Sequence, residues 1–168
     1  MVWRGNTTTL DRIFAALVYI VPLIRAMEFS QPLLRELPFL NVLLIPLLPL
    51  FVVYGQVARL FPFGLGDLVI FLALFFLVVR NERIRHFIRF NTMQALLISI
   101  ILSIFSILWA LIATILPLLG GTIIEDTIFN VLFLGAFAAS IYSVFQSIRG
   151  KYAEIPKLSD YAYTHVRY

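Results

Sequence analysis

The side chains that could carry catalytic chemistry are few, and their spacing fits no catalytic or metal-binding arrangement. The chain contains two histidines, His86 and His165, and no cysteine. These histidines are not at the spacing of metal ligands, and no glycine-rich loop that could hold a phosphate is present. Serines occur in the apolar segments without a neighbouring base to activate them. The sequence therefore predicts a protein that is not an enzyme and that uses no cofactor or metal.

Small residues recur at helical spacing in two apolar segments, 95–119 and 128–148. They form one narrow stripe on each helix: Ser99, Ser103, Ser106 and Ala110 on the first, and Gly135, Ala139, Ser143 and Ser147 on the second. In lipid, hydrophobicity does not drive helices together, so close backbone approach and hydroxyl hydrogen bonds must do so. We expect the two stripes to pack against each other. The alternative is that they line a polar path through the bundle.

The composition places these helices in a membrane. Of the 168 residues, 61% are hydrophobic and 13% are charged, and the mean hydropathy is +0.97. A soluble domain carries roughly 25% charged residues, about twice as many, because its surface faces water. The net charge of +4 comes without a basic stripe interleaved with aromatic residues, so we expect no nucleic-acid partner. Residues 1–168 are predicted to form a single membrane domain whose first partner is the lipid bilayer.

Four segments are long enough to cross about 30 Å of hydrocarbon as α-helices. We predict transmembrane helices at 37–58, 60–79, 95–119 and 128–148, arranged as two hairpins in an all-α integral membrane protein. Pro46 and Pro49 fall inside the first helix and predict a kink. Segment 13–24 is ambiguous because Arg12 and Arg25 enclose only twelve residues. It could lie at the interface, re-enter the membrane, or span it with both arginines reaching the headgroups.

The basic residues predict the orientation. Segment 80–94 resembles a short amphipathic helix in the headgroup plane and carries Arg80, Arg83, Arg85 and Arg89. The polar tail 149–168 adds further basic residues, whereas the 120–127 loop has none. Because positive loops stay on the cytoplasmic side, both termini are expected in the cytoplasm or stroma. Asp67, the only acid within an apolar segment, is then expected near the opposite interface, where water solvates it.

Several polar strings resemble one known family. They are Val79-Arg80-Asn81-Glu82, Arg89-Phe90-Asn91 with Gln94-Ala95, and Gly150-Lys151 with Ile155-Pro156 and Ser159-Asp160. In this order they are similar to the twenty-kilodalton subunit of the chloroplast inner-envelope protein translocon and its cyanobacterial and plastid-encoded homologues. The resemblance implies four membrane helices and a place in a multi-subunit protein-conducting complex. It also implies other translocon subunits, copies of this chain and a polypeptide substrate as partners.

Three functions are compatible with these features. The first is a non-enzymatic translocon subunit, in a cyanobacterial plasma membrane or a plastid inner envelope, that contributes to the protein-conducting path. The second is a small-solute transporter or channel, in which the proline-broken segment 37–58 offers backbone carbonyls to a substrate. The third is a scaffolding membrane protein whose 80–94 helix and tail dock partners.

Overall fold

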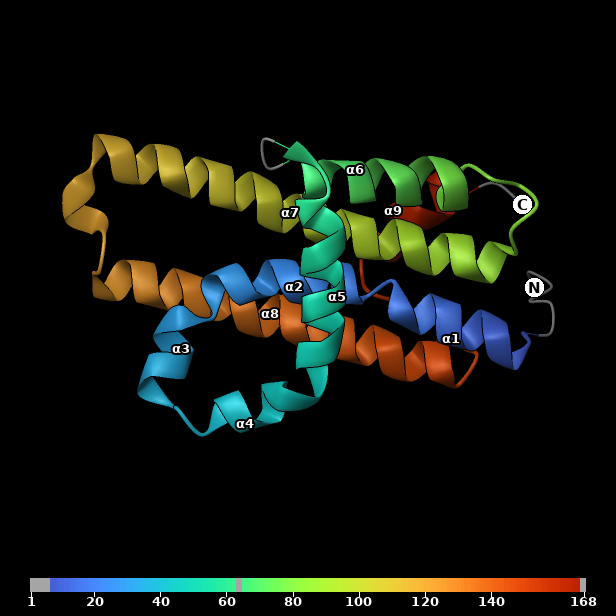
Figure 1. The fold of residues 1–168 in the computed structure, drawn as a ribbon, viewed down its shortest axis with the longest axis horizontal. Helices are drawn as coiled ribbons and strands as arrows, with labels where there is room; N and C mark the ends of the chain where they lie inside the picture. Colours follow the sequence, from blue (N-terminus) through green and yellow to red (C-terminus); the bar gives the residue numbers. More distant parts are fainter. Residues whose placement is uncertain (1–6, 63–64, 167–168) are drawn as a thin grey trace.

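Helices account for all the regular structure in the residues that the computed structural model describes, 7–62 and 65–166 (Figure 1). The helices are α1 (Thr9–Leu17), α2 (Ile20–Ala26), α3 (Gln31–Glu36), α4 (Leu40–Leu44), α5 (Leu48–Arg59), α6 (Gly66–Ala73), α7 (His86–Ile115), α8 (Ile123–Ile148) and α9 (Leu158–His165). Short 3-10 turns occupy Met27–Phe29, Ile45–Leu47 and Pro117–Leu119, and a π-helix extends α6 over Leu74–Val79. The predicted all-α class is confirmed. Residues 1–6, 63–64 and 167–168 of the predicted domain lie outside the described part.

The two longest helices, α7 and α8, form an antiparallel frame (Figure 1). They contain 30 and 26 residues, about 45 and 39 Å, and either length exceeds the hydrocarbon thickness. Pro117 ends the first helix, and Thr122 starts the second by accepting a hydrogen bond from the Glu125 backbone N–H. At the other end Gly150 adopts φ +71°, a conformation that glycine tolerates, and stops α8. The predicted spans 95–119 and 128–148 fall largely within these helices.

The predicted interfacial helix over 80–94 was wrong. No proline or glycine separates residues 86–94 from the apolar run, so they form the first turns of α7. Most of them are buried, including Phe90, Asn91 and Gln94. Arg89 is also buried, and its Nε donates to the Val79 carbonyl at 2.9 Å. Arg80, Arg83 and Arg85 lie in or beside the loop before α7, at one end of the bundle.

The ambiguous segment 13–24 lies at the centre of the molecule. Helices α1 and α2 run between α7 and α8 and contact both of them more extensively than the long helices contact each other (Figure 1). Ala15, Tyr19 and Ala26 are fully buried there. Ile13 and Leu17 of this segment remain exposed. Because α7 and α8 cover its other face, the segment does not need the length of a helix that faces lipid on every side.

The helix predicted over 37–58 does not run alongside α7 and α8. Leu40–Arg59 has the length and composition of a span, but α5 lies across the bundle in Figure 1. The 3-10 turn Ile45–Leu47, which contains Pro46, interrupts this stretch, and Pro49 sits in the first turn of α5. The following helix, Gly66–Val79, is shorter and returns toward the basic loop. The structure thus departs from the predicted first hairpin, while three helices qualify as candidate spans by length and composition: Leu40–Arg59, His86–Ile115 and Ile123–Ile148.

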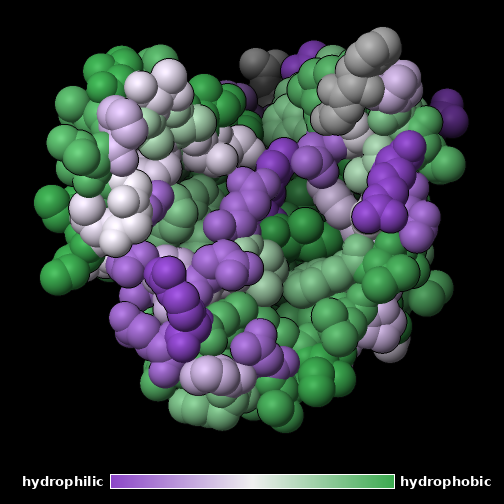
Figure 2. Space-filling view, turned by 60° about the vertical axis from the view of Figure 1, so that its left-hand side comes forward, coloured by the Kyte–Doolittle hydropathy of each residue, from purple (hydrophilic) through white to green (hydrophobic). Residues whose placement is uncertain are grey.

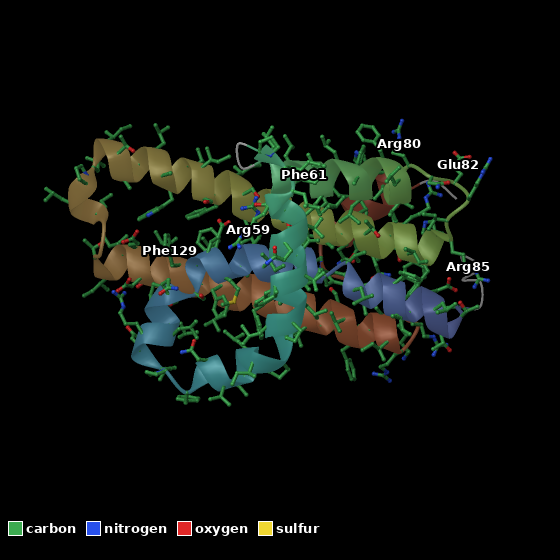
Figure 3. All side chains as sticks on the ribbon, viewed as in Figure 1. Arg59, Phe61, Arg80, Glu82, Arg85 and Phe129 are labelled. Atoms are coloured by element: carbon green, nitrogen blue, oxygen red, sulfur yellow. The ribbon has the colours of Figure 1, made fainter. Side chains whose placement is uncertain are left out.

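The predicted polar tail is partly a packed element. Helix α9 folds back onto α7, where Ala162 and Val166 are buried against Phe90 and Leu96. The start of α1, the end of α8 and the loop that carries Arg80, Glu82 and Arg85 lie at one end of the bundle (Figures 1 and 3), which we call the basic end.

Asp11 connects the N-terminal helix to the loop at the basic end. Its carboxylate completes a capping box with Thr8 and pairs with Arg85 at 2.5 Å. Burial raises the pKa of Asp11, but the hydrogen bonds from Thr8 and the charge of Arg85 outweigh it, so the pKa lies below its ordinary value. The carboxylate therefore keeps its negative charge, and with it the ion pair to Arg85, down to acidic pH.

Replacing Gly66 should separate α5 from α6. A Cβ at Gly66 would lie 2.0 Å from the Ala58 carbonyl oxygen, so the Gly66→Ala variant must push the two helices apart. We expect a loss of about 1–3 kcal/mol of stability, measured by thermal unfolding in detergent. Gly55→Ala is the control because a Cβ there meets nothing within 4 Å. Equal melting temperatures for the two variants would contradict the close approach.

Candidate functional site

A cluster of buried polar side chains joins three helices where α1 ends and α2 begins. The Tyr19 hydroxyl lies 3.0 Å from Asn91 Oδ1 and 3.3 Å from Gln94 Oε1, both on α7. From α8, Ser147 Oγ donates to the same Asn91 oxygen at 3.0 Å, while Asn91 Nδ2 donates to the Phe87 carbonyl at 2.8 Å. We call Tyr19, Asn91, Gln94, Ser143 and Ser147 the polar seam. It fixes the N-terminal helices between α7 and α8.

The polar seam contains more polar atoms than its hydrogen bonds use. Gln94 Nε2 of the seam, and Ser140 Oγ beside it on α8, are buried and have no hydrogen-bond partner among the described residues. Leaving such a group unpaired costs about 1–3 kcal/mol, so alanine in place of Ser140 would pack at lower cost. Close helix packing alone therefore does not account for these side chains.

The two small-residue stripes do not face each other, because α1 and α2 lie between the helices that carry them. On α8, Ser143 and Ser147 are buried, Ala139 is partly buried and Gly135 is exposed. A four-residue spacing rotates by about 40° per step around a helix with 3.6 residues per turn, so the stripe leaves the buried face. On α7, Ser99 is buried, Ser103 and Ser106 are partly buried, and Ala110 is exposed.

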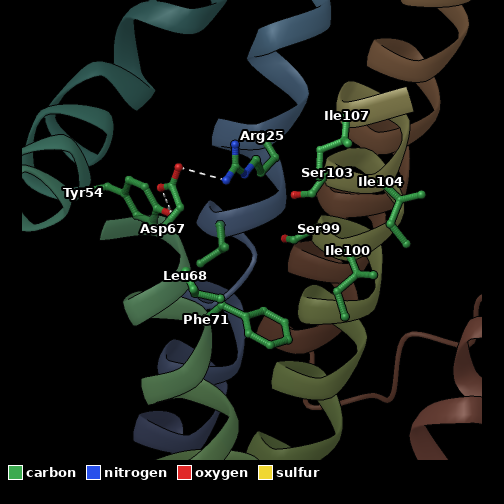
Figure 4. Close-up of a pocket in the computed structure, with 11 residues that line it drawn as sticks. Arg25, Tyr54, Asp67, Leu68, Phe71, Ser99, Ile100, Ser103, Ile104 and Ile107 are labelled. Atoms are coloured by element: carbon green, nitrogen blue, oxygen red, sulfur yellow. Dashed lines mark hydrogen bonds and ion pairs between the residues drawn. The ribbon is translucent and has the colours of Figure 1, made fainter. Parts of the chain in front are cut away.

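A second polar cluster borders a cavity of about 280 Å³. Arg25 Nη2 of α2 pairs with Asp67 Oδ2 of α6 at 2.9 Å, and the Tyr54 hydroxyl of α5 donates to Asp67 Oδ1 at 2.8 Å. Ser99 and Ser103 point toward this pair from α7 (Figure 4). The remaining lining residues are apolar: Val21, Leu68, Phe71, Ile100, Ile104 and Ile107. We call this cavity the ion-pair pocket.

The ion-pair pocket lies beside the middle of the longest helix. Its lining on α7 runs from Ser99 to Ile107, within a helix that extends from His86 to Ile115. Charged groups at such a depth must face protein or a polar cavity, because lipid cannot solvate them. In Figure 2, hydrophilic side chains gather in a hollow between hydrophobic lobes. The expectation that Asp67 is simply solvated at an interface was therefore incomplete, since Arg25 and Tyr54 hold its carboxylate.

Sequence reasoning missed most residues of these two clusters, although some signals were present. Asp67 stood out as the only acid in an apolar segment, and Arg25 bounded the ambiguous segment. Their pairing joins positions 42 residues apart, which helical periodicity cannot reveal. Among the described residues, no three His, Cys, Asp or Glu side chains are grouped as a metal site. The two clusters offer hydrogen bonds and one ion pair, and these can hold or guide a ligand.

Comparison of the sequence with known proteins relates the chain to one family. Residues 8–162 match the family described as "Chloroplast import apparatus Tic20-like". A Tic20 family protein of Synechocystis is 46% identical over 158 residues, covering 94% of each chain. A Tic20 family protein Ycf60 of Gracilaria tenuistipitata is 34% identical over 163 residues, covering 92% of this chain and 74% of the relative. Protein TIC 20-II, chloroplastic, of Arabidopsis thaliana is 26% identical over 159 residues, covering 93% and 72%. The polar seam and the ion-pair pocket both lie inside the matched region.

Removing the Tyr19 hydroxyl should weaken the polar seam. In the Tyr19→Phe variant the Gln94 oxygen loses its hydrogen bond from the Tyr19 hydroxyl and stays buried, so we expect the free energy of unfolding to fall by about 1–3 kcal/mol, as measured by thermal unfolding. Tyr142→Phe is the control, because its hydroxyl accepts an exposed hydrogen bond from Gln146 one turn away. If both variants unfold like the parent protein, Tyr19 does not hold the helices together.

The Arg25–Asp67 pair should show stronger coupling than an exposed pair. We expect a double-mutant cycle of Arg25→Gln and Asp67→Asn to give about 1–3 kcal/mol. The same cycle on Arg35 and Asp126, whose arginine side chain is 67% exposed, should give at most about 1 kcal/mol. Thermal unfolding in detergent measures both couplings. Equal values would show that the pocket pair is as solvated as the surface pair.

Proposed function

The chain belongs to the Tic20 family, and from this premise we propose that it is a non-enzymatic subunit of a membrane complex that moves polypeptides. The family description, which names the chloroplast import apparatus, supports a role in protein translocation. We place the chain in a cyanobacterial plasma membrane or a plastid inner envelope, with the basic end on the cytoplasmic or stromal side. Arg80, Arg83, Arg149 and Lys151 near that end support this orientation.

The observation that carries the proposal is the ion-pair pocket. An unfolded chain presents amide groups together with side chains of every kind, so its path needs apolar walls and a few polar groups rather than a fixed ligand set. The pocket has this character: most of its lining residues are apolar, and Arg25, Tyr54, Asp67 and the serine hydroxyls supply the polar contacts. In this proposal Ser99 and Ser103 of the α7 stripe line the polypeptide path, which was the alternative to helix packing for these serines.

Other subunits, or further copies of this chain, should complete the path. The α5 helix exposes apolar side chains along its length, among them Val52, Val53 and Val57. Gly66–Val79 consists of eight α-helical and six π-helical residues, about 20 Å, which is shorter than the hydrocarbon core. A helix this short, next to one that lies across the bundle, requires neighbouring protein to shield its ends. The polypeptide path is therefore proposed to form within an assembly.

Crosslinking to an arrested polypeptide tests this function. Because the sequence contains no cysteine, a single Ser103→Cys variant can carry a photoreactive group at the pocket. A polypeptide that stalls during passage, because its end is folded, should crosslink to this position in intact membranes. Ile101→Cys is the matched control: Ile101 lies two residues away at nearly the same depth, is exposed, and points about 160° away around the helix.

The adduct at Ser103→Cys should exceed that at Ile101→Cys several-fold and should disappear when the polypeptide is released. Equal labelling at both positions, or none at either, would contradict a path through the pocket. The transporter function would be favoured instead if no polypeptide adduct formed and if the protein carried a small solute across the membrane only when Pro46 and Pro49 were present.

A further inference from the structure

A second cavity, unrelated to the ion-pair pocket, opens on the outer surface of the bundle. It has a volume of about 300 Å³. All of its lining residues are apolar: Ile13, Ala16, Leu17, Ile20, Leu23, Leu47, Leu50, Ile141, Val144 and Ile148. We call it the apolar cleft. An apolar cleft at membrane depth favours an apolar occupant, because an empty one forfeits dispersion contacts and water gains no hydrogen bonds there.

Three parts of the chain form the apolar cleft. Helices α1 and α2 supply one wall and α8 supplies the other, while Leu47 and Leu50 close it from the proline-broken stretch before and within α5. Several lining side chains remain exposed, including Ile13, Leu17 and Ile148. The cleft is therefore open to the surrounding lipid, and its two walls lead toward the basic end.

Each wall carries an arginine where it reaches the basic end. Arg12 directly precedes Ile13, and Arg149 directly follows Ile148. Arg12 Nε donates to Thr7 Oγ1 at 3.1 Å, and the Arg149 guanidinium lies over the Phe145 ring at 5.2 Å. Asp11, the acidic residue next to Arg12 in the sequence, forms its ion pair with Arg85. Within residues 7–62 and 65–166, neither Arg12 nor Arg149 has an ion-pair partner.

Gly150 lets the Arg12 side chain reach the end of α8, where Arg149 is the C-cap residue. A Cβ at this position would lie 2.9 Å from Arg12 Nε, so the Arg12 side chain passes directly against the end of α8. Arg149 is the neighbouring residue, and the two cationic groups therefore flank the same helix end. Two guanidinium groups beside an apolar cleft at the membrane surface suit a lipid with an anionic headgroup, because guanidinium binds phosphate through paired hydrogen bonds.

We propose that the apolar cleft holds one acyl chain of an anionic diacyl lipid from the leaflet at the basic end, with its headgroup between Arg12 and Arg149. This lipid site is independent of the polypeptide path, since the cleft and the ion-pair pocket share no lining residue. A bound lipid would fill the space between the N-terminal helices, α8 and the segment that crosses them. It would thus brace α1 and α2 in their position between the long helices.

The test compares two lipids with identical acyl chains on the purified full-length protein in detergent. Phosphatidylglycerol should bind more tightly than phosphatidylcholine, as measured by native mass spectrometry and by the rise in melting temperature. The Arg12→Gln/Arg149→Gln variant should lose affinity for phosphatidylglycerol by about fivefold for each arginine. Its affinity for phosphatidylcholine should not change. The Arg12→Lys/Arg149→Lys variant should regain most of the preference, because it keeps both charges.

Matched variants separate this site from general charge and general packing. Arg80→Gln/Arg83→Gln removes two charges from the loop at the same end. This variant should keep the full preference for phosphatidylglycerol over phosphatidylcholine. Ala16→Phe fills the cleft and should weaken the binding of both lipids. Ala110→Phe adds the same bulk on an exposed part of α7 and should weaken the binding of neither lipid.

Three outcomes would overturn the proposal. The first is equal binding of the two lipids by the parent protein. The second is a full phosphatidylglycerol preference in Arg12→Gln/Arg149→Gln. The third is equal stabilisation by soluble glycerol phosphate, which has the anionic group but no acyl chain to enter the cleft.

Discussion

The insertion of α1 and α2 between α7 and α8 is the contact on which the rest of the structure depends. It is held by the Tyr19 hydroxyl, which reaches Asn91 and Gln94, and by Ser147, which reaches the same Asn91 oxygen. In a membrane these groups cannot exchange their partners for water, so the helices that carry them must stay together. Because the N-terminal helices occupy this position, the long helices meet over a small area, where Ser147 of α8 reaches Asn91 of α7.

The proline-broken stretch before α5 determines where the two cavities form. Since α5 turns across the bundle instead of running along it (Figure 1), Tyr54 comes within hydrogen-bond distance of Asp67 on one side. Leu47 and Leu50 close the apolar cleft on the other side. One interruption of a helix thus contributes to both the polar cavity proposed for polypeptide and the apolar cavity proposed for lipid. Gly66 fixes the geometry because it lets α6 approach the end of α5.

The basic end joins residues that lie far apart in the sequence. Arg89 donates to the Val79 carbonyl, Asp11 pairs with Arg85, and α9 packs on the first turns of α7. Arg89 and Arg85 are thereby committed to the fold, although the sequence suggested that all four arginines from Arg80 to Arg89 act only on orientation. The difference arises because a helix that begins at His86 carries Arg89 into its packed face.

The amino-acid sequence was sufficient to predict a membrane protein, the all-α class, the candidate spans within α7 and α8, and the family. These follow from composition, from uncharged runs and from short polar strings, all of which are local properties. Tertiary packing was needed to show that segment 13–24 runs between α7 and α8 and that α5, in the second half of 37–58, lies across the bundle. Span length indicates what a helix needs when it faces lipid, but it does not indicate which helix the protein itself surrounds. The pairing of Tyr19 with Asn91 and of Arg25 with Asp67 joins residues 72 and 42 positions apart, and only packing brings such side chains together.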